Sequence, residues 1–327
     1  MKAIVNTAPG ELTWMDRPLP EPGQGQVRIR TATCGICATD LAMIDGWDRT
    51  GFPSIPGHEW SGVVDALGTG ADDALRGRPC VAENVLTDGG EVGFEHPGGY
   101  GQFLLTEAAN VHVLPDGFPM EQAALTEPLA VCVRAMRRLH MARTESALVL
   151  GDGVIGLLML VLLKRAGVAT LAMVGGRPAR LALAGEFGAE CVLNYHDAAR
   201  DLDASVAGMP GHPFANVIEA SGSAAALVSA MGAAAREGKV LVVGDYDMGR
   251  ADFAWNDLMH RELDLIGSCA SAGAWAEAVS LATSGAVPLD RLISHHVRTS
   301  DYAHGIERAR NDRDALKVVL DWREEPL

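Results

Sequence analysis

The chain has 327 residues, which is long enough for two domains with sizeable hydrophobic cores. Hydrophobic residues make up 48% of it and the mean hydropathy is slightly positive, so the composition is globular rather than disordered. The formal net charge of −15, with no basic patch to offset it, excludes a nucleic-acid-binding surface and is typical of an acidic cytoplasmic protein.

The N-terminal segment MKAIVNTAPG has neither an apolar signal-peptide core nor a cleavage site. The most apolar run, Val154 to Leu163, is too short to span a bilayer. Six cysteines in a chain of this length favour reduced thiols or metal ligands over a disulfide scaffold. We therefore expect a cytoplasmic protein that binds neither membranes nor nucleic acid.

The first third of the chain is predicted to be β-rich, with a Pro/Gly-rich loop at Pro18 to Gly25. Short strands separated by turn signals at this spacing favour a small barrel-like domain. The expected strands are Lys2–Asn6, Leu12–Asp16, Val27–Ala32 and Ser61–Leu67.

From about Ala130, helix-length apolar stretches alternate with short β-branched runs, which predicts a parallel, doubly wound sheet. The expected strands are Ala147–Leu150, Ala169–Val174, Cys191–Leu193, Val217–Ala220, Val240–Val243 and Leu263–Ile266. The expected helices are Val154–Ala166, Pro178–Phe187 and Ala224–Ala235.

After Ser268 the pattern is mixed again, and this tail is able to return to the first domain. It predicts helices at Trp275–Thr283 and Tyr302–Arg310 and strands at Ile293–Val297 and Lys317–Leu320. The expected domains are therefore 1–129, 130–270 and a returning segment 271–327.

The turn GDGVIG, residues 151–156, lies between a predicted strand and a predicted helix. Gly151 permits a tight turn, Gly153 lets a pyrophosphate approach the backbone, and Gly156 lets the helix pack closely on the strand. Val154 and Ile155 are the first residues of the predicted helix, and the free N–H groups at a helix start favour binding of a phosphate group. Although such a motif is weak alone, its strand–helix context predicts a dinucleotide site.

Three polar clusters precede this turn: Cys34-x-x-Cys37 followed by Thr39 and Asp40, then His58-Glu59, then Glu127 before a proline. Separately, these are commonly a redox pair or buried thiols, a core histidine and a loop acid. Together, a thiolate, an imidazole and a carboxylate are able to form a three-ligand zinc site with an open position. A Lewis acid beside a hydride carrier suits alcohol oxidation.

Nearly all of the chain resembles the zinc-dependent medium-chain dehydrogenase/reductase family. The resemblance is carried by PEPGQGQVRIR, CGICATD, PGHEWSGVV, GGYGQF, TEPLAV, GDGVIG and KVVL, in that order. It implies an α/β protein with a GroES-like, β-rich catalytic domain, completed by the C-terminal tail, around a doubly wound Rossmann domain.

The resemblance also implies roles for individual residues. Cys37 and His58 match zinc ligands, whereas Cys34 matches a structural position. Glu59 matches an acid that either binds the metal or supports its ligands, and Glu127 matches an acid that contacts zinc or its water in polyol and threonine dehydrogenases. Thr39 matches the residue that starts the proton relay from the substrate hydroxyl. Asp40 is expected to orient His58.

Two departures from the family pattern matter. The lobe that carries a second, structural zinc in other members is shortened to about Asn84–Pro97 and lacks its four cysteines, so we expect one catalytic zinc only. The relay histidine of some alcohol dehydrogenases is Ala42 here, so the proton must leave by water or another group.

The end of the second Rossmann strand distinguishes NAD from NADP. The acid expected of an NAD site is replaced by Gly175, and Arg177 and Arg180 follow. This resembles the GSRP loop of NADP-dependent microbial alcohol dehydrogenases and favours NADP(H) over NAD(H), with Arg177 binding the 2′-phosphate.

The predicted activity is reversible hydride transfer between a secondary alcohol and NADP(H). The alcohols considered include polyols and sugar-derived alcohols. The alternatives are a zinc-independent quinone or enoyl reductase of the same superfamily and a non-enzymatic cofactor-binding protein. The sequence leaves open the substrate, the physiological direction, the third zinc ligand (Glu59 or Glu127) and the choice between homodimer and homotetramer.

Overall fold

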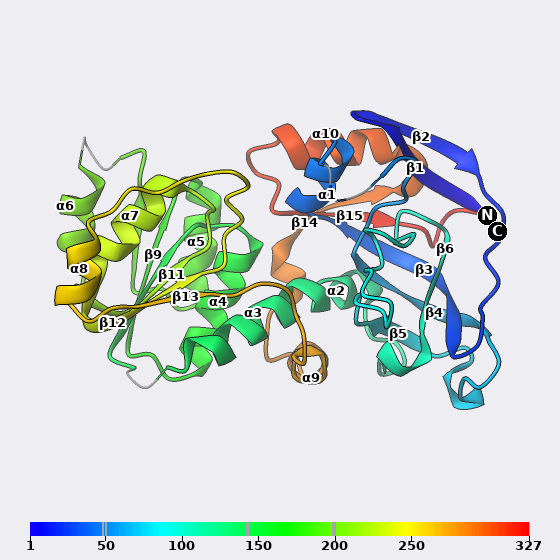
Figure 1. The fold of residues 1–327 in the computed structure, drawn as a ribbon, viewed down its shortest axis with the longest axis horizontal. Coiled ribbons are helices and arrows are strands. Elements are labelled where there is room, and N and C mark those ends of the chain that lie inside the picture. The colour runs from blue at the N-terminus through cyan, green and yellow to red at the C-terminus, as the bar shows by residue number, and fades with distance from the viewer. Residues whose placement is uncertain (48, 50, 142–143, 198–200, 327) are drawn as a thin grey trace. The chain divides into compact units, whose positions relative to one another are not determined.

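The computed structural model describes residues 1–47, 49, 51–141, 144–197 and 201–326 (Figure 1). The chain divides into two compact units. Unit 1 comprises Met1–Ala130 together with Ala272–Leu327, and unit 2 comprises Val131–Ser271. None of the described helices is both long and apolar enough to cross a bilayer.

Unit 1 is built mainly on antiparallel strands, although β14 and β15 pair in parallel. Strands β1 (Lys2–Ala8) and β2 (Glu11–Asp16) form a hairpin, and a second sheet has the order β14-β15-β3-β4-β5-β7, with β6 also paired to β3. The strands of this second sheet are β3 (Gln26–Ile36), β4 (Glu59–Leu67), β5 (Pro79–Ala82), β6 (Phe103–Glu107), β7 (Val111–Val113), β14 (Ile293–Arg298) and β15 (Lys317–Asp321).

The C-terminal segment is an integral part of this sheet. Strand β15 pairs antiparallel to β3, with Val318 opposite Ile36 and Asp321 opposite Thr33, as the red and blue strands of Figure 1 show. Buried side chains from both ends of the chain, such as Val27 and Leu320, belong to one hydrophobic core. The second sheet of unit 1 is therefore incomplete without β15.

The helices of unit 1 are short and connect its strands. They are α1 (Ala38–Ile44), α2 (Met120–Ala124), α9 (Trp275–Thr283), α10 (Tyr302–Asn311) and the 3₁₀ turns η1 (Asp73–Leu75), η2 (Ala108–Asn110), η3 (Leu289–Leu292) and η4 (Thr299–Asp301). Helix α3 (Thr126–Leu139) continues from unit 1 into unit 2.

Unit 2 is a six-stranded, wholly parallel sheet of order β10-β9-β8-β11-β12-β13. Its strands are β8 (Ser146–Leu150), β9 (Thr170–Gly175), β10 (Cys191–Asn194), β11 (Phe214–Glu219), β12 (Ala234–Val242) and β13 (Asp264–Gly267). Its helices are α4 (Val154–Arg165), α5 (Pro178–Glu186), α6 (Leu202–Ala207), α7 (Ala224–Ala233) and α8 (Trp255–His260).

This strand order is that of a doubly wound dinucleotide-binding sheet, in which the first strand, β8, lies beside the fourth, β11. The predicted fold class, a GroES-like β-rich domain plus a Rossmann domain, is confirmed. Several predicted bounds are wrong, most clearly around β12, which begins at Ala234 rather than at Val240. Helix α7 ends at Ala233, because Ala234 pairs with Phe214 and begins β12. Sheet pairing there outweighs the helix propensity of the alanine run.

Candidate functional site

The candidate metal site of unit 1 starts where β3 ends. Cys37 immediately follows β3 and precedes α1, and the Asp40 carboxylate on the first turn of that helix accepts a hydrogen bond from the Cys37 N–H (2.9 Å). The same carboxylate accepts the Gly57 N–H (3.2 Å) and lies 3.0 Å from Nδ1 of His58. Asp40 is fully buried, and its contacts with both residues fix the position of Cys37 relative to His58.

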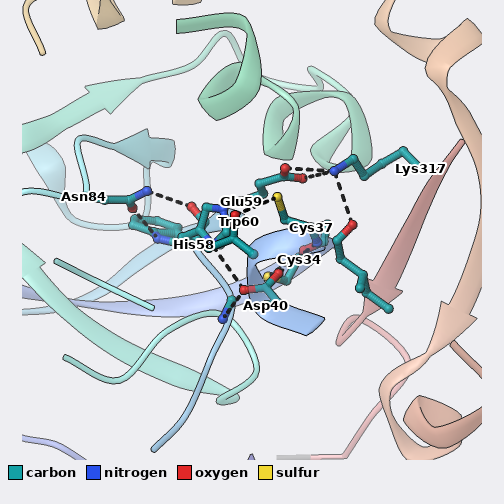
Figure 2. A network of polar contacts seen from close by, with 12 residues as sticks. Cys34, Cys37, Asp40, His58, Glu59, Trp60, Asn84 and Lys317 are labelled. Atoms are coloured by element: carbon teal, nitrogen blue, oxygen red, sulfur yellow. Dashed lines mark hydrogen bonds and ion pairs between the residues drawn. The ribbon is translucent and has the colours of Figure 1, made fainter. Parts of the chain in front are cut away.

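Figure 2 shows how the side chains of this site converge. The Cys37 thiol, the His58 imidazole and the Glu59 carboxylate, the last at the start of β4, place one potential ligand atom each within 4.8 Å of one another. A thiolate, an imidazole and a carboxylate are ligand types that zinc accepts. With Nδ1 of His58 engaged by Asp40, Nε2 is left for a metal.

One of these candidate ligands, Glu59, also belongs to a buried ion pair. The Lys317 ammonium, on β15, lies 2.8 Å and 2.6 Å from the two carboxylate oxygens of Glu59 and donates to the Ile36 carbonyl (3.2 Å). Only 4% of Lys317 and 2% of Glu59 are exposed. Burial by itself would lower the pKa of Lys317, but the negative charge of Glu59 raises it above its ordinary value. Lys317 therefore neutralises Glu59 and competes with a metal for its oxygens.

The backbone of His58 is held from the opposite side. Asn84 donates its amide N–H to the His58 carbonyl (2.9 Å) and accepts the indole N–H of Trp60 (3.2 Å). The ring of Phe94 lies 4.9 Å from the imidazole, and the guanidinium of Arg49 lies 4.3 Å from the centre of that ring. His58 is thus restrained at its ring, its carbonyl and its Nδ1 atom.

Phe94 belongs to the shortened lobe, residues 84–97. One ion pair joins two residues of this lobe, and two others connect the lobe to Arg49. Asp88 lies 2.9 Å from Nε2 of His96. Arg49 reaches Glu91 (2.6 Å) and Glu95 (2.9 Å). These contacts connect the lobe to the candidate site through the ring of Phe94.

The remaining predicted residues of this site occupy distinct positions. Oγ1 of Thr39 lies 3.7 Å from Sγ of Cys37. Glu127 lies on the first turn of α3, outside the Cys37–His58–Glu59 group, although His58 and Lys317 act on it electrostatically. Burial raises the pKa of Glu127 to about 7, and the charge of Glu59 adds to this effect.

Cys34 is fully buried in the core of unit 1. Its Sγ lies so close to Gly57 and Gly99 that a Cβ on either glycine would stand 2.8 Å or 2.7 Å from it. Burial raises the pKa of this thiol well above its ordinary value, and the charges of Asp40 and Glu59 add to the rise. The two cysteines of the C-x-x-C pattern therefore differ in environment, since only Cys37 is within reach of the candidate ligands.

In unit 2, the glycine turn connects β8 to α4. Gly151 has φ +114°, and a Cβ there would stand 2.8 Å from the backbone of Ala220. A Cβ on Gly156 would stand only 1.9 Å from the Gly151 carbonyl oxygen. At Gly153, by contrast, no atom of the described chain comes within 4 Å of an added Cβ. Gly151 and Gly156 serve packing, and the space beside Gly153 fits an approaching phosphate.

The other predicted cofactor residues follow β9. Gly175 ends that strand, Arg177 precedes α5, and Arg180 lies in the first turn of α5. A residue that sequence analysis passed over lies among them. The Asp152 carboxylate, from the glycine turn, accepts the N–H groups of Gly176 (2.9 Å) and Arg177 (2.8 Å).

Two protein-family models match the chain. The alcohol dehydrogenase GroES-like domain matches residues 23–116, and the zinc-binding dehydrogenase domain matches residues 154–284. D-arabitol-phosphate dehydrogenase of Enterococcus avium is 26% identical, with 98% of this chain and 97% of the relative covered. L-threonine 3-dehydrogenase of Chelativorans sp. (strain BNC1) is 29% identical, over 98% of this chain and 99% of the relative.

Solved structures show the same fold. An NADP-bound protein from Sinorhizobium meliloti 1021, described as a zinc-binding dehydrogenase, has a TM-score of 0.91 at 25% identity and covers 98% of each chain. An alcohol dehydrogenase from Escherichia coli CFT073, complexed with NADH, has a TM-score of 0.91 at 24% identity, over 98% of this chain and 99% of the other. The two domain matches together cover more than half of the sequence, and the chain belongs to the zinc-type medium-chain dehydrogenase/reductase family.

Proposed function

We propose that this dehydrogenase transfers a hydride between a secondary alcohol and NADP(H) at a single catalytic zinc. The observation that carries this proposal is the convergence of Cys37, His58 and Glu59, whose ligand atoms lie within 4.8 Å of one another. When bound, zinc supplies a Lewis acid for the alcohol or carbonyl oxygen, and the nicotinamide supplies or accepts the hydride.

The residues of the chain would prepare this chemistry. Asp40 holds the imidazole of His58 in the tautomer that presents Nε2 to the metal. Burial by itself would lower the pKa of His58, but Asp40 and Cys37 raise it well above its ordinary value, so zinc must displace a proton to bind. Thr39, beside Cys37, is the proposed first acceptor of the substrate hydroxyl proton.

Glu59 and Glu127 are the two candidates for the third protein ligand. Glu59 lies within the ligand group, but its oxygens are shared with Lys317, whereas Glu127 lies outside the group with its proton affinity raised by burial. Comparing zinc content in Glu59→Gln and Glu127→Gln distinguishes the two. The variant that loses zinc identifies the ligand.

The proposed preference for NADP(H) is supported by Gly175 in place of an acid and by Arg177 beside it. A guanidinium suits a 2′-phosphate, with which it forms paired hydrogen bonds. The ratio of kcat/KM for NADPH to that for NADH tests this preference, and a strong preference for NADH would contradict it.

The proposed substrate class is a polyol or another secondary alcohol. The relatives named for D-arabitol phosphate and L-threonine support it, since both compounds carry secondary hydroxyl groups. Turnover of a panel of polyols, polyol phosphates, amino sugars, threonine and simple secondary alcohols with NADP⁺ would narrow the class. We also propose a homodimer or homotetramer, which light scattering of the purified protein measures.

The decisive test is Cys37→Ser, with Cys191→Ser on β10 as the matched control. Cys37→Ser should lose zinc and turnover while NADP(H) binding stays within about twofold, because the cofactor turn belongs to a different unit. Cys191→Ser should retain both zinc and turnover. Full activity of Cys37→Ser, or of zinc-stripped enzyme, would instead support a zinc-independent reductase.

A further inference from the structure

We propose that Asp152 sets cofactor selectivity, because its carboxylate occupies the place of the acid missing at the end of β9 and opposes a 2′-phosphate. This inference rests on the proposed nicotinamide dinucleotide site at residues 151–156. Asp152 is the second residue of the glycine motif, a position at which the motif specifies no residue. The inference gives it the role in cofactor selection that a residue at the end of the next strand has in other Rossmann sheets.

The geometry of Asp152 carries the argument. Its Oδ2 accepts the N–H groups of Gly176 and Arg177, at 2.9 Å and 2.8 Å, directly before α5 begins at Pro178. A Cβ built on Gly175 would stand 2.6 Å from Cβ, Cγ and Oδ2 of Asp152. The Asp152 side chain therefore fills the space into which an acidic side chain at position 175 would project.

A carboxylate in this place acts differently on the two cofactors. At the end of the second strand of a Rossmann sheet, a carboxylate accepts a hydrogen bond from the 2′-hydroxyl of NAD. A 2′-phosphate carries a charge of about −1.5 to −2, as phosphomonoesters do, and is repelled by a carboxylate at such short range. The phosphate also needs N–H donors, and Asp152 already occupies two of them.

Asp152 and Arg177 thus act in opposite directions on adjacent positions of one loop. The guanidinium of Arg177 attracts a 2′-phosphate, while Asp152 repels it and accepts a hydroxyl. For NADP(H) to use the N–H groups of Gly176 and Arg177, the Asp152 side chain has to leave them. We therefore expect an enzyme that binds both cofactors and whose preference depends on residue 152.

The test measures binding rather than turnover. Isothermal titration of the purified enzyme with 2′,5′-ADP and with 5′-AMP compares ligands that differ only in the 2′-phosphate and cannot react. Asp152→Asn removes the charge but keeps an oxygen for the two N–H groups. It should raise the ratio of 2′,5′-ADP affinity to 5′-AMP affinity by roughly ten- to a hundredfold, the same shift appearing with NADPH and NADH.

Glu190→Gln is the matched control. Glu190 directly precedes β10, at the opposite end of the parallel strands, and its carboxylate lies 3.8 Å from the Lys164 ammonium in an exposed ion pair. Its removal changes the net charge equally and should shift the ratio less than twofold. An unchanged ratio in Asp152→Asn, or an equal loss of affinity for both ligands, would overturn the inference and leave Asp152 as a residue that only orders the loop between β9 and α5.

This outcome is separable from that of the proposed function. If the unmodified enzyme prefers NADH, the proposed NADP preference fails, yet the shift caused by Asp152→Asn still tests the inference. If neither nucleotide binds, both fail.

A second variant tests the shared space directly. Gly175→Asp alone should lower the Tm of the cofactor-free protein, because its Cβ would collide with Asp152. Combined with Asp152→Gly, it should restore the Tm and shift the affinity ratio toward 5′-AMP. A Tm that is equally low in both variants would show that the two side chains do not compete for one place.

Discussion

The two candidate sites of this protein are prepared in different ways. In unit 1, four buried ionisable side chains, Asp40, His58, Glu59 and Lys317, contact one another in two pairs before any metal is considered. In unit 2, the glycine turn relies on backbone geometry, and its charged residue, Asp152, binds the backbone N–H groups of Gly176 and Arg177. Ion pairs between buried side chains order the first site. The second depends on glycines, whose lack of a Cβ permits close backbone contacts.

This difference decides what each site tolerates. Removing one member of a buried ion pair leaves an uncompensated charge, which is costly wherever the chain places it. Adding a methyl group to a glycine turn is costly only where another backbone already lies. Unit 1 should therefore be sensitive to charge changes, and unit 2 to volume changes at particular positions.

The largest expected effect comes from Lys317→Met. It leaves Glu59 buried without its partner, and should lower the free energy of unfolding by about 3–5 kcal/mol. Chemical denaturation of the metal-free protein measures this loss. The double variant Glu59→Gln/Lys317→Met removes both charges and should recover most of it, whereas a double variant as unstable as the single one would break the comparison.

The paired variants Gly156→Ala and Gly153→Ala sharpen the comparison from the side of unit 2. Gly156→Ala should cost about 1–3 kcal/mol of stability, because its Cβ would collide with the Gly151 carbonyl. Gly153→Ala meets open space among the described atoms and should leave Tm nearly unchanged while weakening nucleotide binding about tenfold or more. Thermal unfolding and nucleotide titration separate the two effects, and similar Tm losses would contradict the division of roles.

A smaller effect is expected for Asp40→Asn. The amide can still accept the Cys37 N–H, but it loses the charge that orients and polarises His58. Zinc affinity should fall about 10- to 100-fold, as measured by competition with a chelator. Asp88→Asn, which breaks the more exposed carboxylate–histidine contact to His96, is the control and should leave zinc affinity unchanged.

The smallest effect concerns an exposed ion pair of unit 1. Arg310 binds both carboxylate oxygens of Asp45, at 2.8 Å and 2.7 Å, and lowers the pKa of that carboxyl below its ordinary value of 3.8. The pair therefore contributes stability above about pH 4, and this contribution disappears as the pH falls through the lowered pKa.

Because 54% of the Asp45 side chain is exposed, Asp45→Asn should cost under about 1 kcal/mol near pH 7. The difference in stability from the unmodified protein should shrink as the pH falls below about 4 and should vanish once the pH lies below the lowered pKa of Asp45. A cost equal to that of Lys317→Met would show that burial is not what distinguishes the first site.

The fold could be predicted because its signals are local, and the same short motifs contain Cys37, His58 and Glu59, which the structure brings together. The alternation of β-branched runs and helices fixed the Rossmann sheet, and the order of short motifs indicated the GroES-like domain. Lys317 could not be identified in this way, because its partner Glu59 lies 258 residues earlier and only the sheet brings them together. Asp152 was missed because it occupies a position at which the glycine motif specifies no residue.

The pairing of β15 with β3 affects the order in which the two units can complete their folds during synthesis. The segment that completes unit 1 emerges from the ribosome last, whereas unit 2 is one uninterrupted stretch of chain. Until this segment emerges, Glu59 lacks the Lys317 ammonium, and Thr33–Ile36 of β3 lack their partner strand β15. The Rossmann unit should therefore complete its fold first, while the first 130 residues wait as an exposed, unfinished sheet that chaperones and proteases can recognise.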